Sequence, residues 1–156
     1  MFDYQHSINS GDPNPKTIVN TKKGLLSALL ASVVYLAIGY VFYYVIFADF
    51  FVRNAGSAIG VYRPEMIVWA VFLAQLSLGT LTVLACSYAP KASSIGDGMK
   101  IGAWIGLLVG VATAFDLYGV SHVQNLTATL VDTTLWIVRA SIAGGVAIWM
   151  LDKEPS

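Results

Sequence analysis

Two charged side chains, Asp132 and Arg139, lie inside the last apolar stretch of the sequence, residues 126–151, and are the groups best suited to chemistry. A charge at the centre of a bilayer costs about 2.5–3.5 kcal/mol on insertion scales, so the folded protein must receive it. Seven helical steps of about 100° return nearly to the same face, with a rise of about 10 Å. Because helical side chains lean toward the N-terminus of their helix, Arg139 leans toward Asp132. The spacing allows a direct pair, or a bridge through water or a polar group of another helix.

This pair has two interpretations. It is either a structural clamp that neutralises charge inside a helix bundle, or it lines a pathway for a substrate or a proton, the default hypothesis for ionisable groups in a membrane. Gln75 lies in the middle of another apolar stretch and needs a partner on a second helix. Asp116 lies near the end of a third stretch. We therefore predict an intramembrane polar cluster that contains Asp116, Asp132, Arg139 and Gln75, with Asn125 as a further candidate.

Composition places these residues in a membrane. The chain has 156 residues, of which 56% are hydrophobic and only 12% are charged, and its mean hydropathy is +0.68. Soluble domains average about 25% charged residues, whereas apolar runs of about 20 residues are long enough to cross a bilayer. The net charge is zero, so no nucleic-acid partner is expected. The single cysteine, Cys86, lies inside an apolar stretch and is interpreted as a small buried hydrophobe.

Four apolar stretches define the predicted architecture. We predict an all-α, polytopic membrane protein in which four transmembrane helices form an antiparallel bundle over residues 24–151. Residues 1–23 are polar and contain two prolines, which indicates a flexible N-terminal arm, and residues 152–156 form a polar tail. The four helices are expected at about residues 24–51, 65–88, 99–118 and 126–151.

The third helix carries a row of small residues four positions apart: Gly102, Gly106, Gly110 and Ala114. Such a face lets the backbone of a neighbouring helix approach closely. The connection over residues 119–125 is short, so the third and fourth helices are expected to be antiparallel neighbours. We therefore expect the row to serve a contact within one chain, and a contact with a second copy is the alternative.

Basic residues predict the orientation in the membrane. With four spans both termini lie on one side, and this side holds six lysines, whereas the other side holds Arg53 and Arg63. The positive-inside rule therefore predicts that both termini are cytoplasmic, in the cytoplasmic (inner) membrane of a bacterium. The predicted polar cluster then lies toward the outer half of the membrane. The six lysines are Lys16, Lys22, Lys23, Lys91, Lys100 and Lys153.

No catalytic motif is found in the sequence. There is no Ser/His/Asp set, no pair of histidines at metal-ligand spacing and no phosphate-binding loop. His122 stands alone in a loop, and the scattered carboxylates do not complete the roles that an active site needs. The chain is therefore predicted not to be an enzyme and to hold no metal or cofactor, and a lipid is the bound molecule that the sequence allows.

A short pattern joins the third and fourth helices. In this pattern an Asp-Leu pair ends one helix, a run similar to Asn-Leu-Ala-Thr-Leu begins the next helix, and Asp and Trp follow. In this chain the pair is Asp116-Leu117, the run is residues 125–130, and the two following residues are Asp132 and Trp136. In this pattern the segment from Phe115 to Trp136 resembles a family of small, uncharacterised four-span bacterial membrane proteins. In this chain the gap before residue 125 is longer, the tryptophan is displaced by one residue, and the glycine that usually follows is absent. The resemblance implies the fold and the membrane location, but no activity.

Two functions follow from these observations. The first is a structural or accessory subunit of a larger membrane complex, with membrane lipids, other subunits or further copies of the chain as partners. The alternative is a small transporter or ligand-binding bundle that uses the Asp132 and Arg139 face. A water-filled cavity beside Arg139 would favour transport or ligand binding, whereas a dry interior with an apolar outer surface would favour the subunit.

Overall fold

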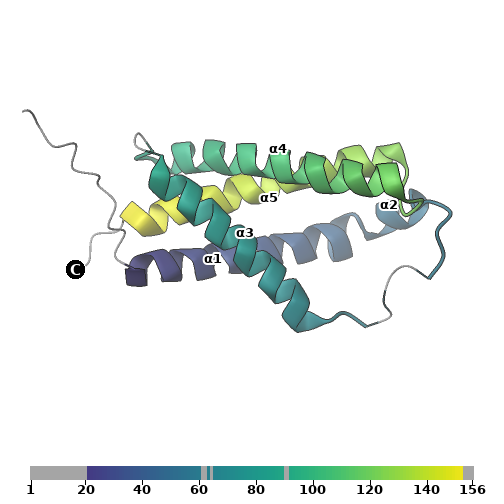
Figure 1. Ribbon diagram of the computed structural model, residues 1–156, viewed down its shortest axis with the longest axis horizontal. Coiled ribbons are helices and arrows are strands. Elements are labelled where there is room, and N and C mark those ends of the chain that lie inside the picture. The colour runs from purple at the N-terminus through teal and green to yellow at the C-terminus, as the bar shows by residue number, and fades with distance from the viewer. Residues whose placement is uncertain (1–20, 61–62, 64, 90–91, 153–156) are drawn as a thin grey trace, which may run out of the picture.

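Helices occupy nearly all of the described chain, because a backbone inside a membrane must satisfy its hydrogen bonds within the segment. The computed structural model describes residues 21–60, 63, 65–89 and 92–152, so most of the predicted arm and tail lies outside it (Figure 1). Four helical runs are long and apolar enough to cross a membrane. The prediction of an all-α, four-span membrane protein is therefore confirmed. The elements are α1 (Thr21–Tyr40), the π-helical turn η1 (Val41–Ile46), α2 (Ala48–Arg53), α3 (Val68–Tyr88), α4 (Ile95–Val120) and α5 (Leu126–Asp152).

The start of α1 and the end of α5 lie at the same end of the bundle (Figure 1), which we call the terminal end. The opposite end, where α2 lies and α5 begins, is the distal end. The distal loops are joined by hydrogen bonds from the Gly56 backbone to Val123 (2.9 Å) and from Ala58 to His122 (3.1 Å). An added Cβ at Gly56 would collide with the carbonyl group of His122, so this contact requires glycine.

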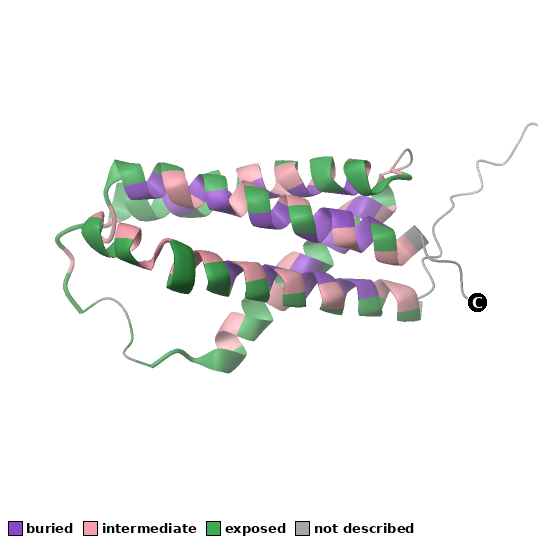
Figure 2. Cartoon of the chain, turned by 180° about the vertical axis from the view of Figure 1, so that it is seen from behind, coloured by how far each residue is buried: buried purple, intermediate pink, exposed green. Residues whose placement is uncertain are grey.

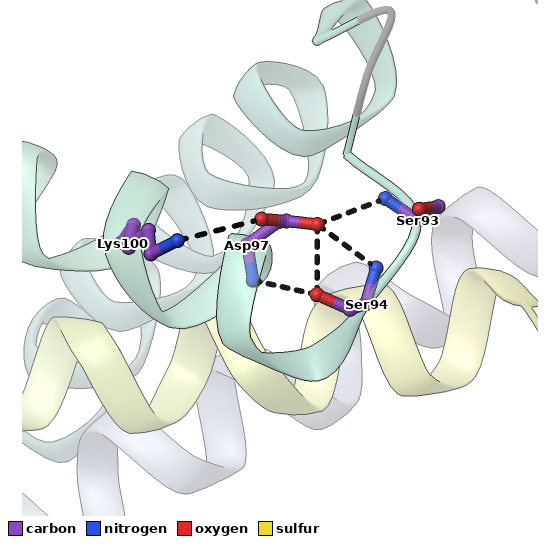
Figure 3. A network of polar contacts seen from close by, with 4 residues as sticks. All are labelled: Ser93, Ser94, Asp97 and Lys100. Atoms are coloured by element: carbon purple, nitrogen blue, oxygen red, sulfur yellow. Dashed lines mark hydrogen bonds and ion pairs between the residues drawn. The ribbon is translucent and has the colours of Figure 1, made fainter.

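Three helices begin at residues other than those expected. The helix α1 begins at Thr21, three residues earlier than expected, and the expected helix over residues 24–51 is divided into α1, η1 and α2. The helix α3 begins at Val68, three residues later than expected, because Ile67 has an extended backbone conformation. The helix α4 begins at Ile95, four residues earlier than expected. There the Ser94 hydroxyl accepts a hydrogen bond from the Asp97 backbone (3.1 Å), and the Asp97 carboxylate accepts one from the Ser94 backbone (3.2 Å) (Figure 3). This capping box satisfies backbone N–H groups at the start of the helix.

The tightest helix pair is α4 and α5, and the row of small residues makes the contact. Cβ atoms added at Gly102 and Gly106 would collide with backbone atoms of Ala140 and Trp136 respectively. From α5, Gly144 faces the backbone of α4 in the same way. The row on α4 is therefore used inside the chain, as expected. Its members Gly102, Gly106, Gly110 and Ala114 are all buried.

The second contact brings α1 against α3 and α5 at the terminal end. Side chains here are small, so the helices approach closely and polar groups can bond across them. The Ser27 hydroxyl donates to the Ala147 carbonyl on α5 (3.1 Å). On α3, a Cβ at Gly79 would collide with Ser32 of α1, which marks the point where the two helices cross.

The helix α3 is held along only part of its length. It crosses α1 obliquely, and its distal half diverges from the other helices (Figure 1). Figure 2 shows buried residues on α3 near the crossing and mainly exposed residues beyond it. Its apolar window is 17% buried, whereas that of α5 is 44% buried. The central helix of the bundle is thus α5, and α3 is the most peripheral.

Candidate functional site

Arg139 lies in the interior of the bundle, against the faces of three aromatic rings. Its side chain is 5% exposed. The guanidinium carbon lies 3.4 Å from the centre of the Trp136 ring, 5.9 Å from that of Tyr35 and 5.7 Å from that of Tyr43. Aromatic faces attract cations, by about 2 kcal/mol or more where water is excluded. We call these three aromatic residues the Arg139 cage.

The Arg139 guanidinium packs against a glycine in α1. A Cβ added at Gly39 would lie 3.1 Å from the Nη1 atom of Arg139, which is closer than ordinary van der Waals contact. Gly39 is buried, so the guanidinium lies directly against the backbone of α1. A Cβ at this position would require the guanidinium to shift by a few tenths of an ångström. Gly39 was not singled out from the sequence, because its role depends on a residue of another helix.

The π-helical turn aims Tyr43 at the cage. In a regular α-helix, residues eight apart such as Tyr35 and Tyr43 differ in direction by about 80°. In the π-helix η1 each residue advances through a smaller angle than in an α-helix. The backbone N–H of Phe47 accordingly bonds to the carbonyl of Phe42, five residues earlier (2.8 Å). Tyr43 is thereby brought back toward the face of Tyr35. The β-branched and aromatic residues of this turn have low helix propensity, which lowers the cost of the irregularity.

Tyr43 also links the two charges of the predicted pair. Its hydroxyl donates a hydrogen bond to the Asp132 carboxylate, and its ring faces Arg139. Among the described residues, no ion pair within 4.0 Å joins Asp132 to Arg139. A polar group of another helix therefore occupies the bridging position between them. This arrangement has the character of a clamp that ties α5 to η1.

The edge of the Arg139 guanidinium lacks hydrogen-bond acceptors. The guanidinium carbon lies only 3.4 Å from the centre of the Trp136 ring, so the guanidinium plane stacks on the face of the ring and does not point an N–H group at it. The five N–H donors of a guanidinium point outward in its plane. Nε is buried without a partner, and no residue in the described part of the chain accepts a hydrogen bond from this side chain. The cage therefore stabilises the face of the cation and leaves its edge unsatisfied.

The other predicted cluster members lie elsewhere. Asp116 is exposed on α4, because it is about 200° around the helix from the buried Ala114. Asn125 caps the start of α5, where its side chain accepts from the Ala128 backbone (2.9 Å) and donates to Asn54 (3.1 Å). Gln75 lies on α3 with its Oε1 atom buried and without a partner. Of the four predicted residues, the structure brings only Asp132 and Arg139 into one site.

A concave region lies at the distal end, between the loops. It has a volume of about 510 Å³ and is lined by residues of the loop before α5, the end of α4 and Gly56. His122 lies there and is exposed. Within residues 21–60, 63, 65–89 and 92–152, no group of three or more His, Cys, Asp or Glu side chains could hold a metal ion. The region therefore offers one histidine and no arrangement of partners for it.

Comparison with known proteins gives no relative for this chain. No family model, no curated protein and no solved structure matches it. The resemblance of residues 115–136 to small four-span bacterial membrane proteins therefore stays a prediction.

Proposed function

We propose that this multi-pass integral membrane protein is a structural or accessory subunit of a larger membrane complex. The proposal rests on the path of α3 relative to the other helices. The other long helices pack along most of their length, whereas the distal half of α3 diverges from them (Figure 1). Large apolar side chains there are open to the surroundings, with Trp69 71% and Leu73 54% exposed. A helix that its own chain holds by one half is well suited to contact a second protein.

The surroundings of Arg139 support this function over transport. A pathway for a substrate or a proton needs its charged groups to be reached by water. Arg139 is 5% exposed and stacked on Trp136, and the carboxylate of Asp132 is engaged by Tyr43. These contacts favour the structural interpretation of the charged pair, in which it ties α5 to η1.

For the location, we propose the bacterial cytoplasmic membrane with both termini cytoplasmic. The positive-inside rule supports this, because lysines gather toward the terminal end and the arginines outside the spans lie in or beside the loop between α2 and α3. Because α5 covers the row of small residues on α4, a homo-oligomer would need another face. The lysines of the described chain are Lys22, Lys23 and Lys100, while Lys16, Lys91 and Lys153 lie outside the described residues.

Purification tests the proposal directly. The full chain with a C-terminal affinity tag is extracted from its native membranes in mild detergent, and everything that stays bound is quantified by mass spectrometry. We expect other membrane proteins to accompany the chain in a fixed ratio through a second, size-based step. A four-span membrane protein of similar size, tagged and expressed equally, controls for detergent-driven association.

The opposite result is also specific. If the chain elutes as a single species without other proteins, the accessory-subunit function is wrong. A small molecule retained in equal amount would then support the ligand-binding alternative.

A further inference from the structure

The face of α3 that packs on α1 continues past the last residue that another helix covers. Its positions repeat in steps of four and three, the spacing of a helix-packing stripe. The terminal half of the stripe is buried, whereas Phe72 is 40% and Val68 is 68% exposed. We call Val68, Phe72 and Gln75 the distal stripe of α3. The complete series is Val68, Phe72, Gln75, Gly79, Thr82 and Cys86.

Gln75 distinguishes the distal stripe from a surface that needs only lipid. Its Oε1 atom is buried and has no hydrogen-bond partner among the residues that the structure describes. Lipid chains carry no donors, and an unsatisfied polar group in hydrocarbon costs free energy. Nearby Ser77 instead bonds back to the Leu73 carbonyl of its own helix (3.0 Å). Gln75 as a whole is only half-buried, so a side chain from a further helix can pack against it.

Arg139 lacks a hydrogen-bond acceptor, whereas Gln75 lacks a donor. Both side chains lie on the distal side of the contact between Tyr35 and Thr82. The Tyr35 ring lies beside Arg139, and the Tyr35 hydroxyl is 3.0 Å from Thr82 of the stripe. Gln75 is two turns distal of Thr82 along α3. The guanidinium lies against Gly39, about one turn distal of Tyr35 along α1. Both unsatisfied groups therefore lie on the distal side of the contact between Tyr35 and Thr82.

The shape of the guanidinium edge selects the class of partner group. Nε is fully buried, whereas the terminal Nη groups keep some exposed surface, so they are the approachable donors. A carboxylate or a phosphate fits this edge through two parallel hydrogen bonds.

Depth decides between these two anions. Arg139 is the middle residue of the 27-residue helix α5, about 20 Å from either end. The hydrocarbon core of a bilayer is about 30 Å thick, so the guanidinium lies within it even though it leans toward the distal end. Phospholipid phosphates lie outside the core. A carboxylate carried by a membrane-spanning helix can lie at this depth.

We propose that a membrane-spanning helix of a partner protein packs on the distal stripe of α3 and places an aspartate or glutamate carboxylate against the edge of Arg139. This inference rests on the proposed function as a subunit and names the partner's chemistry. A second copy of this chain does not fit, because Asp132 already accepts a hydrogen bond from Tyr43. Its Asp116 lies only four residues from the end of α4, at a shallower depth.

Site-specific photo-crosslinking in native membranes tests the contact. A benzophenone side chain replaces Phe72 in the full chain, and the matched control places it at Trp104, which is 65% exposed on α4. We expect the probe at position 72, but not at 104, to crosslink a membrane-spanning peptide of another protein that contains Asp or Glu. A crosslink to lipid alone, to α1 or α5 of the same chain, to a second copy, or to a segment without an acidic residue would overturn the proposal.

Substitutions then test the two polar groups. Arg139→Met should lower the crosslink yield at position 72 by about thirtyfold or more, because the partner's carboxylate would be left unpaired. Gln75→Leu should lower it by about threefold, whereas Ser77→Ala on the same helix should leave it unchanged. Circular dichroism and monodispersity establish that each variant folds. If Arg139→Met does not fold, the comparison of crosslink yields between Gln75→Leu and Ser77→Ala tests the proposal.

The two proposals can fail separately. If no protein accompanies the unmodified chain through purification, the function as a subunit fails and this inference fails with it. If a partner copurifies but the crosslink at position 72 is unaffected by Arg139→Met or by Gln75→Leu, only the inference is wrong.

Discussion

Replacing Gly102 with alanine should destabilise the protein, because the contact between α4 and α5 leaves no room for a methyl group. The added Cβ would collide with the backbone carbonyl of Ala140 and lie 3.0 Å from the Cα atom of Ser141. Both are backbone atoms, so relief requires the two helices to move apart rather than a side chain to rotate. Overpacking of this kind costs about 1–3 kcal/mol.

Gly119→Ala is the matched control, since it makes the same chemical change on the same helix. A Cβ at Gly119 meets no atom within 4 Å. Gly102→Ala in the helix interior gains about 0.5–1 kcal/mol of helix propensity, and Gly119→Ala gains less because Gly119 is the second-last residue of α4. The steric cost at Gly102 is larger than this difference, so we expect Gly102→Ala to be about 1–2 kcal/mol less stable than Gly119→Ala.

Equilibrium unfolding in mixed micelles measures this difference. The purified variants are titrated with a denaturing detergent, and the loss of structure is followed by far-ultraviolet circular dichroism. Equal stability of the two variants would refute the reasoning, because α4 and α5 would then have space for a methyl group at the point where their backbones are closest.

Three further substitutions have expected outcomes. Tyr43→Phe keeps the ring beside the guanidinium but removes the donor to Asp132, so it should cost about 1–3 kcal/mol of unfolding free energy; Tyr44→Phe, at a position 62% exposed, should cost almost nothing. Thr82→Val removes the partner of a buried tyrosine hydroxyl and should cost about 0.6 kcal/mol in the same unfolding assay. Ser94→Ala removes the cap of α4 and should cost about 0.5–2 kcal/mol, seen as faster hydrogen exchange in the first turn of that helix.

The long-period features of the fold were predictable from the sequence. Apolar runs of sufficient length must form spanning helices, and a row of glycines four apart must meet another backbone. The partner of that row was predictable as a helix but not in register, because Gly144 and Ala140 on α5 were not recognised as the complementary small residues. The early start of α4 had a signal that was missed, since Ser94 and Asp97 have the spacing of a capping box.

The site was only partly predictable. Asp132 and Arg139 were found because charges are costly in a membrane, and Trp136 could have been found because it lies one helical turn before Arg139. Tyr43 could not, because η1 breaks the regular helical period on which any assignment of faces depends. Asp116 was placed in the cluster from its depth alone, whereas its direction around α4 keeps it away. The divergence of α3 has no counterpart in the local sequence pattern.

The Arg139 cage also has a consequence for how the chain is made. α5 leaves the ribosome after α1, α3 and α4, and it carries Arg139 at its centre, which costs about 2.5–3.5 kcal/mol on insertion scales, and a second charge, Asp132, nearer its start. Its Leu, Ile and Val residues, ten in all, return only about 0.3–0.6 kcal/mol each. Left alone, α5 is therefore close to the threshold between insertion and release. Two of the three rings of the cage belong to the α1–η1 segment, which is synthesised before α5, so this earlier span can hold α5 in the membrane.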